Sequence, residues 1–360
     1  MRYKPDIDEA LGRYEAWWNG EMIGRCAVQV TAWRGGRGKA PAAPATAERQ
    51  WTDIGFMMEN RIYAFENIFY GGEAMPVFWP NLGPDLLTAM ICEGAQIRYG
   101  EGTGTTWVSP CAKSPSELKL AFDRDNRYWK LISEMTLEAS KHAKDSYIVG
   151  ITDLHASLDV LAAALGAENL CLALIDEPEA IEKLQDRVFE LFVEIYEAFD
   201  SIIRPYQPNG TTTTLEIWSK KRYYANVCDF IYLISTPMFD RFALPIVRRE
   251  TEYFDETCFH VDGIGSLGHL DSILALEKLK SIQWVYGAGA TTSKDWLGVY
   301  KRIDAAGKQI FAHGPPQDLK YILEAVPPER VLYATSCSSE DEARDYLREV
   351  EKWSFQKKIF

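Results

Sequence analysis

The chain has 360 residues, of which 47% are hydrophobic and 25% charged, so it can bury a large core and is not intrinsically disordered. Its formal net charge of −13 disfavours binding to nucleic acid or to an anionic membrane surface. The seven cysteines include no CxxC pair, and the charged segment 1–18 lacks the apolar stretch of a signal peptide. We therefore expect a cytoplasmic protein without disulfides.

The first 146 residues have an irregular pattern. Residues 1–20 are expected to form a helical segment, and CAVQVT at 26–31 is β-branched enough for a first strand. The small residues, Gly and Pro of 35–46 predict a loop within long irregular insertions at 34–146. MPVFW at 75–79 predicts a further strand inside that region.

From residue 147 onward, short apolar runs alternate with helical stretches, as in βα units. The predicted strands are 147–151, 212–217, 227–231, 257–261, 282–286, 309–312 and 331–335. Helix starts are indicated by Pro178 between two glutamates, by Ser235-Thr236-Pro237 and by Ser338-Ser339 before three acidic residues. With the strand at 26–31 these make eight, and most linkers are long enough for parallel crossovers. The pattern predicts an α/β protein, a single (β/α)8 TIM barrel over 1–360, since no GxGxxG follows the first strand to indicate a doubly wound sheet.

Working side chains of a parallel barrel lie at the carboxyl ends of its strands. His260 and Asp262 are two residues apart on an extended segment and share a face, so they can chelate one ion, or the carboxylate can orient the imidazole. Cys337 follows the last predicted strand at a helix entry, where thiolate is favoured. We expect His260, Asp262 and Cys337 to meet and bind a metal ion. The alternative is that Asp262 caps the turn at Gly263, with His260 as a wall residue and Cys337 as inert packing.

Further polar residues are candidates for catalysis. Asp153 and His155 have the same two-residue spacing and are predicted to act as an acid/base pair, although Asp153 or Ser157 would also serve as a helix N-cap. Glu216 is a carboxylate in an apolar predicted strand, so it needs a partner, a metal or a raised pKa. The predicted catalytic residues are therefore Asp153, His155, Glu216 and Asp262.

Aromatic side chains near the predicted strands suit stacking against a planar or apolar ligand. Asp229, like Glu216, is a carboxylate within an apolar predicted strand, so it also needs a partner, a metal or a raised pKa. The predicted substrate-binding residues are Trp79, Trp218, Asp229, Trp284 and Tyr286. The alternative for the aromatic residues is core packing.

The run FHVDGIGSLGHLDSILAL followed by IQWVYGAG resembles the uroporphyrinogen decarboxylase-like superfamily, including its corrinoid-dependent methyltransferase branch. The segments YIVGITDLHASLDVLAAAL, CDFIYLIS and LYATSCSSEDEA are similar to the same pattern. The resemblance implies a barrel with its pocket at the carboxyl ends of the strands. In the methyltransferases a His-x-Cys pair and a distant Cys hold zinc, which activates a thiol as methyl acceptor. His260 and Cys337 match two of these positions, and Asp262 replaces the middle cysteine. Zinc also accepts carboxylate oxygen.

The decarboxylase branch fits less well, because its members grip propionate groups with an Arg-rich amino-terminal segment. The matching region here offers only Arg25, Arg34 and Arg37. Porphyrinogen decarboxylation is therefore disfavoured.

The leading prediction is a zinc-dependent methyltransferase or demethylase acting on a small methylated compound or a corrinoid methyl carrier. The resemblance allows a corrinoid protein as partner and a homodimer. One alternative is a metal-free decarboxylase or lyase of a small carboxylated substrate, with Asp/His acid–base chemistry. Another is a binding barrel without turnover.

Overall fold

The computed structural model describes residues 1–102, 104–287 and 292–355, so Ala288 and Gly289 of the IQWVYGAG run lie outside the described residues. Its centre is a seven-stranded sheet in the order β2-β1-β11-β10-β9-β8-β7. All neighbouring pairs are parallel except β1 with β2. The strands are β1 (Ala27–Trp33), β2 (Ile68–Gly72), β7 (Tyr223–Val227), β8 (Glu256–Asp262), β9 (Ser281–Val285), β10 (Gln309–His313) and β11 (Val331–Cys337).

Two short pairs of strands stand apart from the large sheet. β3 (Val77–Phe78) pairs in parallel with β6 (Ile148–Val149), and β4 (Gln96–Tyr99) forms an antiparallel hairpin with β5 (Thr106–Ser109). In the described part of the chain, the ladder of the large sheet ends at β2 and at β7. The observed fold is thus α/β with a mainly parallel sheet, and ladder hydrogen bonds do not close it into a ring.

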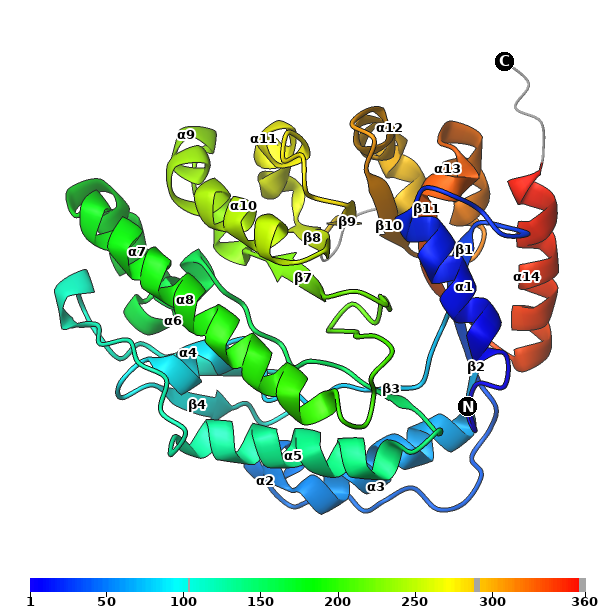
Figure 1. Ribbon diagram of the computed structural model, residues 1–360, viewed down its shortest axis with the longest axis horizontal. Coiled ribbons are helices and arrows are strands. Elements are labelled where there is room, and N and C mark those ends of the chain that lie inside the picture. The colour runs from blue at the N-terminus through cyan, green and yellow to red at the C-terminus, as the bar shows by residue number, and fades with distance from the viewer. Residues whose placement is uncertain (103, 288–291, 356–360) are drawn as a thin grey trace.

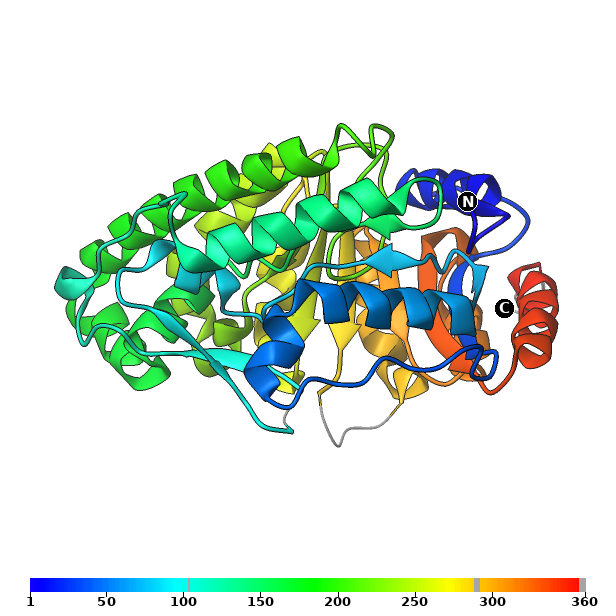
Figure 2. The same cartoon turned by 90° about the horizontal axis from the view of Figure 1, so that it is seen from below.

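Helices cover the outer face of the curved sheet, where α10 to α14 follow one another from β7 to β1 (Figure 1). Figure 2 shows the long helices α5 and α8 running along the opposite side, where they contact each other. The helices are α1 (Ile7–Trp18), α2 (Ala47–Thr52), α3 (Ile54–Asn67), α4 (Leu86–Ile91), α5 (Arg127–Ala143), α6 (Leu158–Leu165), α7 (Ala167–Asp176), α8 (Pro178–Ile203), α9 (Thr236–Met238), α10 (Leu244–Tyr253), α11 (Leu270–Leu274), α12 (Leu297–Ala305), α13 (Asp318–Ala325) and α14 (Glu340–Ser354). The predicted helix starts are confirmed at Pro178, at Thr236, and at α14, where Ser339 accepts the N–H of Glu342.

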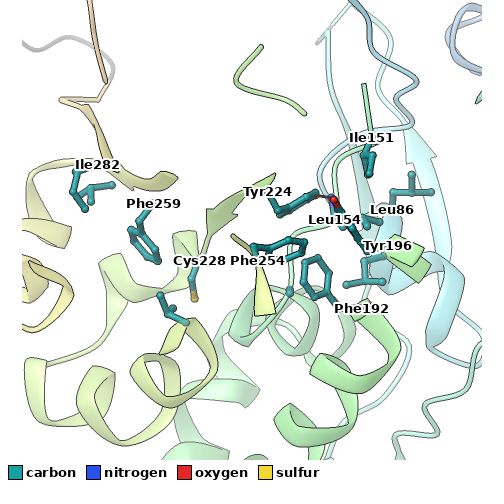
Figure 3. Packing of buried hydrophobic residues seen from close by; sticks show 14 of the residues in the cluster. Leu86, Ile151, Leu154, Phe192, Tyr196, Tyr224, Cys228, Phe254, Phe259 and Ile282 are labelled. Carbon is teal, nitrogen blue, oxygen red and sulfur yellow. Dashed lines mark hydrogen bonds between the residues drawn. The ribbon is translucent and has the colours of Figure 1, made fainter. Parts of the chain in front are cut away.

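The outer core packs strands against helices. Tyr224 of β7 stacks on Phe254 with ring centroids 5.7 Å apart, and Phe192 and Tyr196 of α8 meet Tyr224 edge-on (Figure 3). The Tyr224 hydroxyl accepts the N–H of Leu154 at 2.6 Å, which ties β7 to the segment after β6. Such aromatic burial fixes the segment that carries the site described below.

A second buried cluster lies on the inner face. In this cluster, residues from one face of the large sheet, from the β3–β6 pair and from a turn pack against one another. Its strand and turn members include Ala27, Val77, Ile148, Ile217, Trp218, Tyr223, Ala225, Cys258, Phe311 and Leu332. Alternate residues of each strand point inward, so the reactive residues that continue these rows also face the interior.

Two strand predictions are wrong. Residues 212–217 form a turn between the bridged residues Thr211 and Ser219, with Glu216 at φ 53°. In this Thr-rich segment Thr212 and Thr213 are buried and Ile217 packs in the inner cluster, although the segment joins no sheet. The strand predicted at 227–231 is β7, which ends at Val227; residues Asp229–Leu233 form the 3-10 turn η2. The predictions for β8, β9, β10 and β11 are confirmed to within two residues.

The predicted loop at 35–46 contains no helix or strand. The surrounding region 34–146 holds α2 to α5, β2 to β5 and a short 3-10 turn. Among the described residues, no single helix has the length and apolar character to cross a membrane, while α6 and α7 meet that test only as a pair bent by 115°.

Candidate metal centre and acid–base cluster

Polar side chains converge at the carboxyl ends of β6, β7 and β8. Asp153 and His155 follow β6, Asp229 opens the turn after β7, and His260 and Asp262 end β8. The β7–β8 register pairs Val227 with His260, so Asp229 continues the inward row toward Asp262. This arrangement brings together the two His/Asp pairs predicted separately from the sequence.

The first group, which we call the β8 triad, consists of Asp229, His260 and Asp262. One ligand atom of each lies within 4.8 Å of the others. His260 Nδ1 lies 2.5 Å from Oε1 of Gln283 on β9 and donates its proton there, which leaves the Nε2 lone pair free. Oδ1 of Asp262 is buried and has no hydrogen-bond partner among the described residues. An oriented imidazole and an unpaired carboxylate oxygen are the features of a metal site before a cation binds.

The second group, the β6 triad, consists of His155, Asp159 and the shared Asp229, again with ligand atoms within 4.8 Å. His155 Nε2 lies 3.3 Å from Oδ2 of Asp153, and Nδ1 lies 3.4 Å from Oδ2 of Asp159. Burial disfavours the protonated ring, but the two carboxylates outweigh it and raise the pKa of His155 well above its usual value. The ring is therefore an imidazolium at neutral pH, with both nitrogens used as donors.

Asp159 also determines where β7 ends. Its carboxylate accepts the N–H groups of Asp229 and Phe230, both at 2.9 Å, which caps the turn η2. The carboxylate therefore orients His155 and positions Asp229 at the same time.

Asp229 is exposed to solvent, yet desolvation by the surrounding protein and the charge of Asp159 raise its pKa to about 6, against the lowering effect of His155 and His260. Asp229 is thus the solvent-exposed member of the β8 triad.

Glu216 belongs to neither triad. Its carboxylate lies 3.6 Å from Arg61 of α3, and its backbone carbonyl accepts bonds from Tyr14 and Gln29. Desolvation raises the pKa of Glu216, and Arg61 opposes this shift. The side chain is nevertheless 44% exposed, so Glu216 and Arg61 form a solvent-accessible ion pair apart from the two triads.

Cys337 also lies outside both triads. It ends β11 opposite Ala32 of β1 and is partly buried. Burial, followed by the charge of Glu342, raises the pKa of this thiol to about 11, opposite to the direction expected at a helix entry. Burial is the larger cause, and the Glu342 carboxylate, which accepts the N–H of Ser338 at 2.8 Å, adds negative charge near the sulfur.

The predicted aromatic residues divide into two groups. Tyr286 stacks on His313 with centroids 5.3 Å apart, and both His313 Nδ1 and Trp79 Nε1 are buried without a partner in the described chain. Burial and then the charge of His260 lower the pKa of His313, so His313 lies near the β8 triad and is neutral. Trp218 and Trp284, in contrast, are core residues: Trp218 packs in the inner cluster, and the fully buried Trp284 packs against Trp296.

Sequence reasoning missed three contributors. Asp159 lies four residues after His155, in the first turn of α6, and its carboxylate contacts the His155 ring from there. Gln283 is aligned with His260 only by the register of β8 with β9. Asp85 bonds to Val108 N–H and lies close enough to His155 and Asp159 for their charges to affect its pKa, which burial raises.

The arginines considered for propionate binding have other partners. Arg25 forms a buried pair with Glu73 through bonds of 2.7 and 2.9 Å, and Arg34 bonds to Glu340 at 2.6 Å. Arg37 donates its backbone N–H to Asn67.

Comparison with known proteins gives a likeness of fold. No family model matches the chain, and no curated protein matches it. Among solved structures, a methyltransferase from Methanosarcina mazei superposes with a TM-score of 0.61 at 12% identity, over 96% of this chain and 99% of that one. The chain therefore has the fold of that methyltransferase over nearly its whole length.

Proposed function

We propose that this protein is a zinc-dependent enzyme that transfers or removes the methyl group of a small methylated compound or a corrinoid methyl carrier. The β8 triad carries the proposal, because three ligand atoms from two neighbouring strand ends lie within 4.8 Å of one another and one of the three residues, Asp229, is exposed. The fold shared with a methyltransferase supports methyl transfer as the reaction. A closed (β/α)8 barrel is part of the proposal, supported by the inner cluster that joins the large sheet to β3 and β6.

The residues of the triad fit zinc in number and chemistry. One imidazole nitrogen and two carboxylate oxygens are accepted zinc ligands, and three protein ligands leave a position open for substrate or thiol. In this proposal Asp229 takes the role first predicted for Cys337, whose pKa and position do not favour a thiolate beside His260. That Cys337 binds the zinc ion stays a prediction, which zinc titration of Cys337→Ser would test.

A bound zinc ion would supply Lewis acidity, which polarises the group being transferred or activates a thiol acceptor. The chain itself supplies proton chemistry. The His155 imidazolium, held between Asp153 and Asp159, is a proton donor next to the shared Asp229. Tyr286 and the ring of His313 offer a stacked face beside the triad for a substrate to pack against.

A zinc determination on protein purified without chelator tests the proposal. We expect about one zinc per chain, and methyl transfer from methylcobalamin to a small thiol that stops when zinc is removed and returns when it is restored. His260→Ala should abolish both. Protein with negligible zinc, and with no gain of zinc on titration, would rule out the metal centre.

A metal-free lyase is the second candidate, and the His155 imidazolium is the observation that favours it. Such an enzyme would protonate the carbanion left after loss of carbon dioxide, with Asp229 or Asp262 as its acid–base partner. Activity toward a small carboxylate that survives exhaustive chelation but is lost in His155→Gln would favour the lyase over the methyltransferase.

A further inference from the structure

A second reactive site lies at the base of the β4–β5 hairpin. The hairpin register pairs Gln96 with Ser109, so its two outer ends run on toward Cys92 and Cys111. A turn closed by Ala95 N–H to Cys92 O, with Gly94 at φ 81°, folds the chain back over this end. A Cβ built on Gly94 would lie 4.0 Å from Cβ of Cys111. The thiols of Cys92 and Cys111 are neighbours, and each affects the pKa of the other.

The two thiols have different surroundings. Cys92 is 5% exposed, at the end of α4, where its backbone bridges to Leu120. Cys111 is partly exposed and lines a cavity of about 560 Å³, together with Lys113 and the residues around Gly166 at the start of α7. An accessible sulfur next to a buried one is the arrangement of an attacking and a resolving cysteine.

The two thiols affect each other unequally. The neighbouring Cys92 lowers the pKa of Cys111 to about 7, while Cys111, together with burial, raises the pKa of Cys92 well above its usual value. The lowered pKa increases the share of thiolate at Cys111 near neutral pH, and thiolate is the form that reacts with oxidants.

We propose that Cys111 and Cys92 form a peroxide-sensitive dithiol site. The Cys111 thiolate attacks hydrogen peroxide and, with one proton, gives Cys111 sulfenic acid and water. The thiol of Cys92 then attacks the sulfenic sulfur, which forms the Cys92–Cys111 disulfide and releases a second water. In total the two thiols lose two electrons and two protons, and one peroxide becomes two waters. A dithiol reductant reverses the change.

The site is linked by backbone bonds to the residues behind the metal centre. The N–H groups of Cys111 and Ala112 both donate to the carbonyl of Ala164 near the end of α6, at 2.8 and 3.2 Å. The first turn of α6 holds Asp159, which orients His155. The inference does not depend on the proposed function, since it needs only the two thiols and the cavity.

Peptide mapping tests the site in the full-length protein. After reduction and treatment with one to two equivalents of hydrogen peroxide, we expect a Cys92–Cys111 disulfide, while Cys171, a partly buried cysteine on α7, stays reduced. In Cys92→Ala the disulfide cannot form, and dimedone should instead trap a sulfenic acid at Cys111. Oxidation spread evenly over Cys111 and Cys171, or no 92–111 crosslink, would overturn the proposal.

Alkylation kinetics give an independent readout. Iodoacetamide should modify Cys111 with a pH midpoint of about 7 in the unaltered protein. The midpoint should move toward about 8.5 in Cys92→Ala, with roughly a tenfold lower rate at pH 7. Cys92→Ser keeps a hydroxyl donor and should retain the lower midpoint. Equal midpoints in all three proteins, with unchanged circular dichroism, would also overturn the proposal.

Discussion

His155 and His260 lie on either side of one carboxylate, Asp229, and differ in what their nitrogens contact. His155 has a carboxylate at each nitrogen and is held as an imidazolium, whereas His260 donates one proton to the neutral amide of Gln283 and keeps its other nitrogen free. Each ring has a nitrogen within 4.8 Å of a carboxylate oxygen of Asp229. The comparison teaches that hydrogen-bond partners, and not residue type or spacing, decide which imidazole is available to a metal.

The largest difference between the two rings should appear when each is removed. His260→Ala deletes a ligand, so zinc affinity should fall by at least about a hundredfold, whereas His155→Gln should leave zinc content unchanged. Competition with a fluorescent zinc chelator measures both affinities. Equal losses in the two variants would mean that both rings bind metal and would break the comparison.

The hydrogen bond that orients His260 should have the next largest effect. Gln283→Leu removes the acceptor for Nδ1–H, and zinc affinity should fall by about 10- to 100-fold. Gln283→Glu keeps an acceptor at this position and is the matched control, with affinity close to that of the unaltered protein. If Leu and Glu weaken binding equally, the orienting role of Gln283 is wrong.

The charge on His155 makes a prediction about pH. Its pKa is raised in the folded protein above the unfolded value of about 6.5, so its interactions stabilise the fold fully below that value. This contribution is lost as the pH rises through the folded pKa. The difference in unfolding free energy between unaltered protein and His155→Gln should therefore be larger at pH 6 than at pH 9. Nitrogen-15 spectra at pH 7 should show both His155 nitrogens protonated.

The smallest effect is expected at Cys337. Since this thiol lies outside both triads, Cys337→Ser should change zinc affinity by less than about twofold. Zinc titration of this variant beside His260→Ala gives the measurement. A loss comparable to that of His260→Ala would restore the sulfur as a ligand and require the end of β11 to approach β8.

Local patterns predicted most of the regular half of the fold. β8 to β11 are short apolar runs bounded by turn residues, and this pattern can be recognised from neighbouring residues in the sequence. The run at 212–217 is rich in β-branched threonine, as strands often are, but it forms a turn that is buried by the surrounding strands. The end of β7 was misplaced for a similar reason, since the cap at Asp229 comes from Asp159, seventy residues earlier.

The site was predictable in pairs but not as a whole. Two-residue spacing on extended segments identified Asp153 with His155 and His260 with Asp262. No local pattern indicated that Asp229 lies between these pairs or that Gln283 is aligned with His260. Nor did any local pattern show that Trp218 and Trp284 are core residues and not substrate-binding residues.

The residues along the chain determined the α/β class, most strand positions and which reactive side chains end the strands, because periodicity and residue type are properties of neighbouring positions. The three-dimensional arrangement decided which of those side chains share a carboxylate, which imidazole carries two protons and which keeps a lone pair. Protonation and lone-pair availability depend on groups within a few ångströms, and here those groups come from different strands.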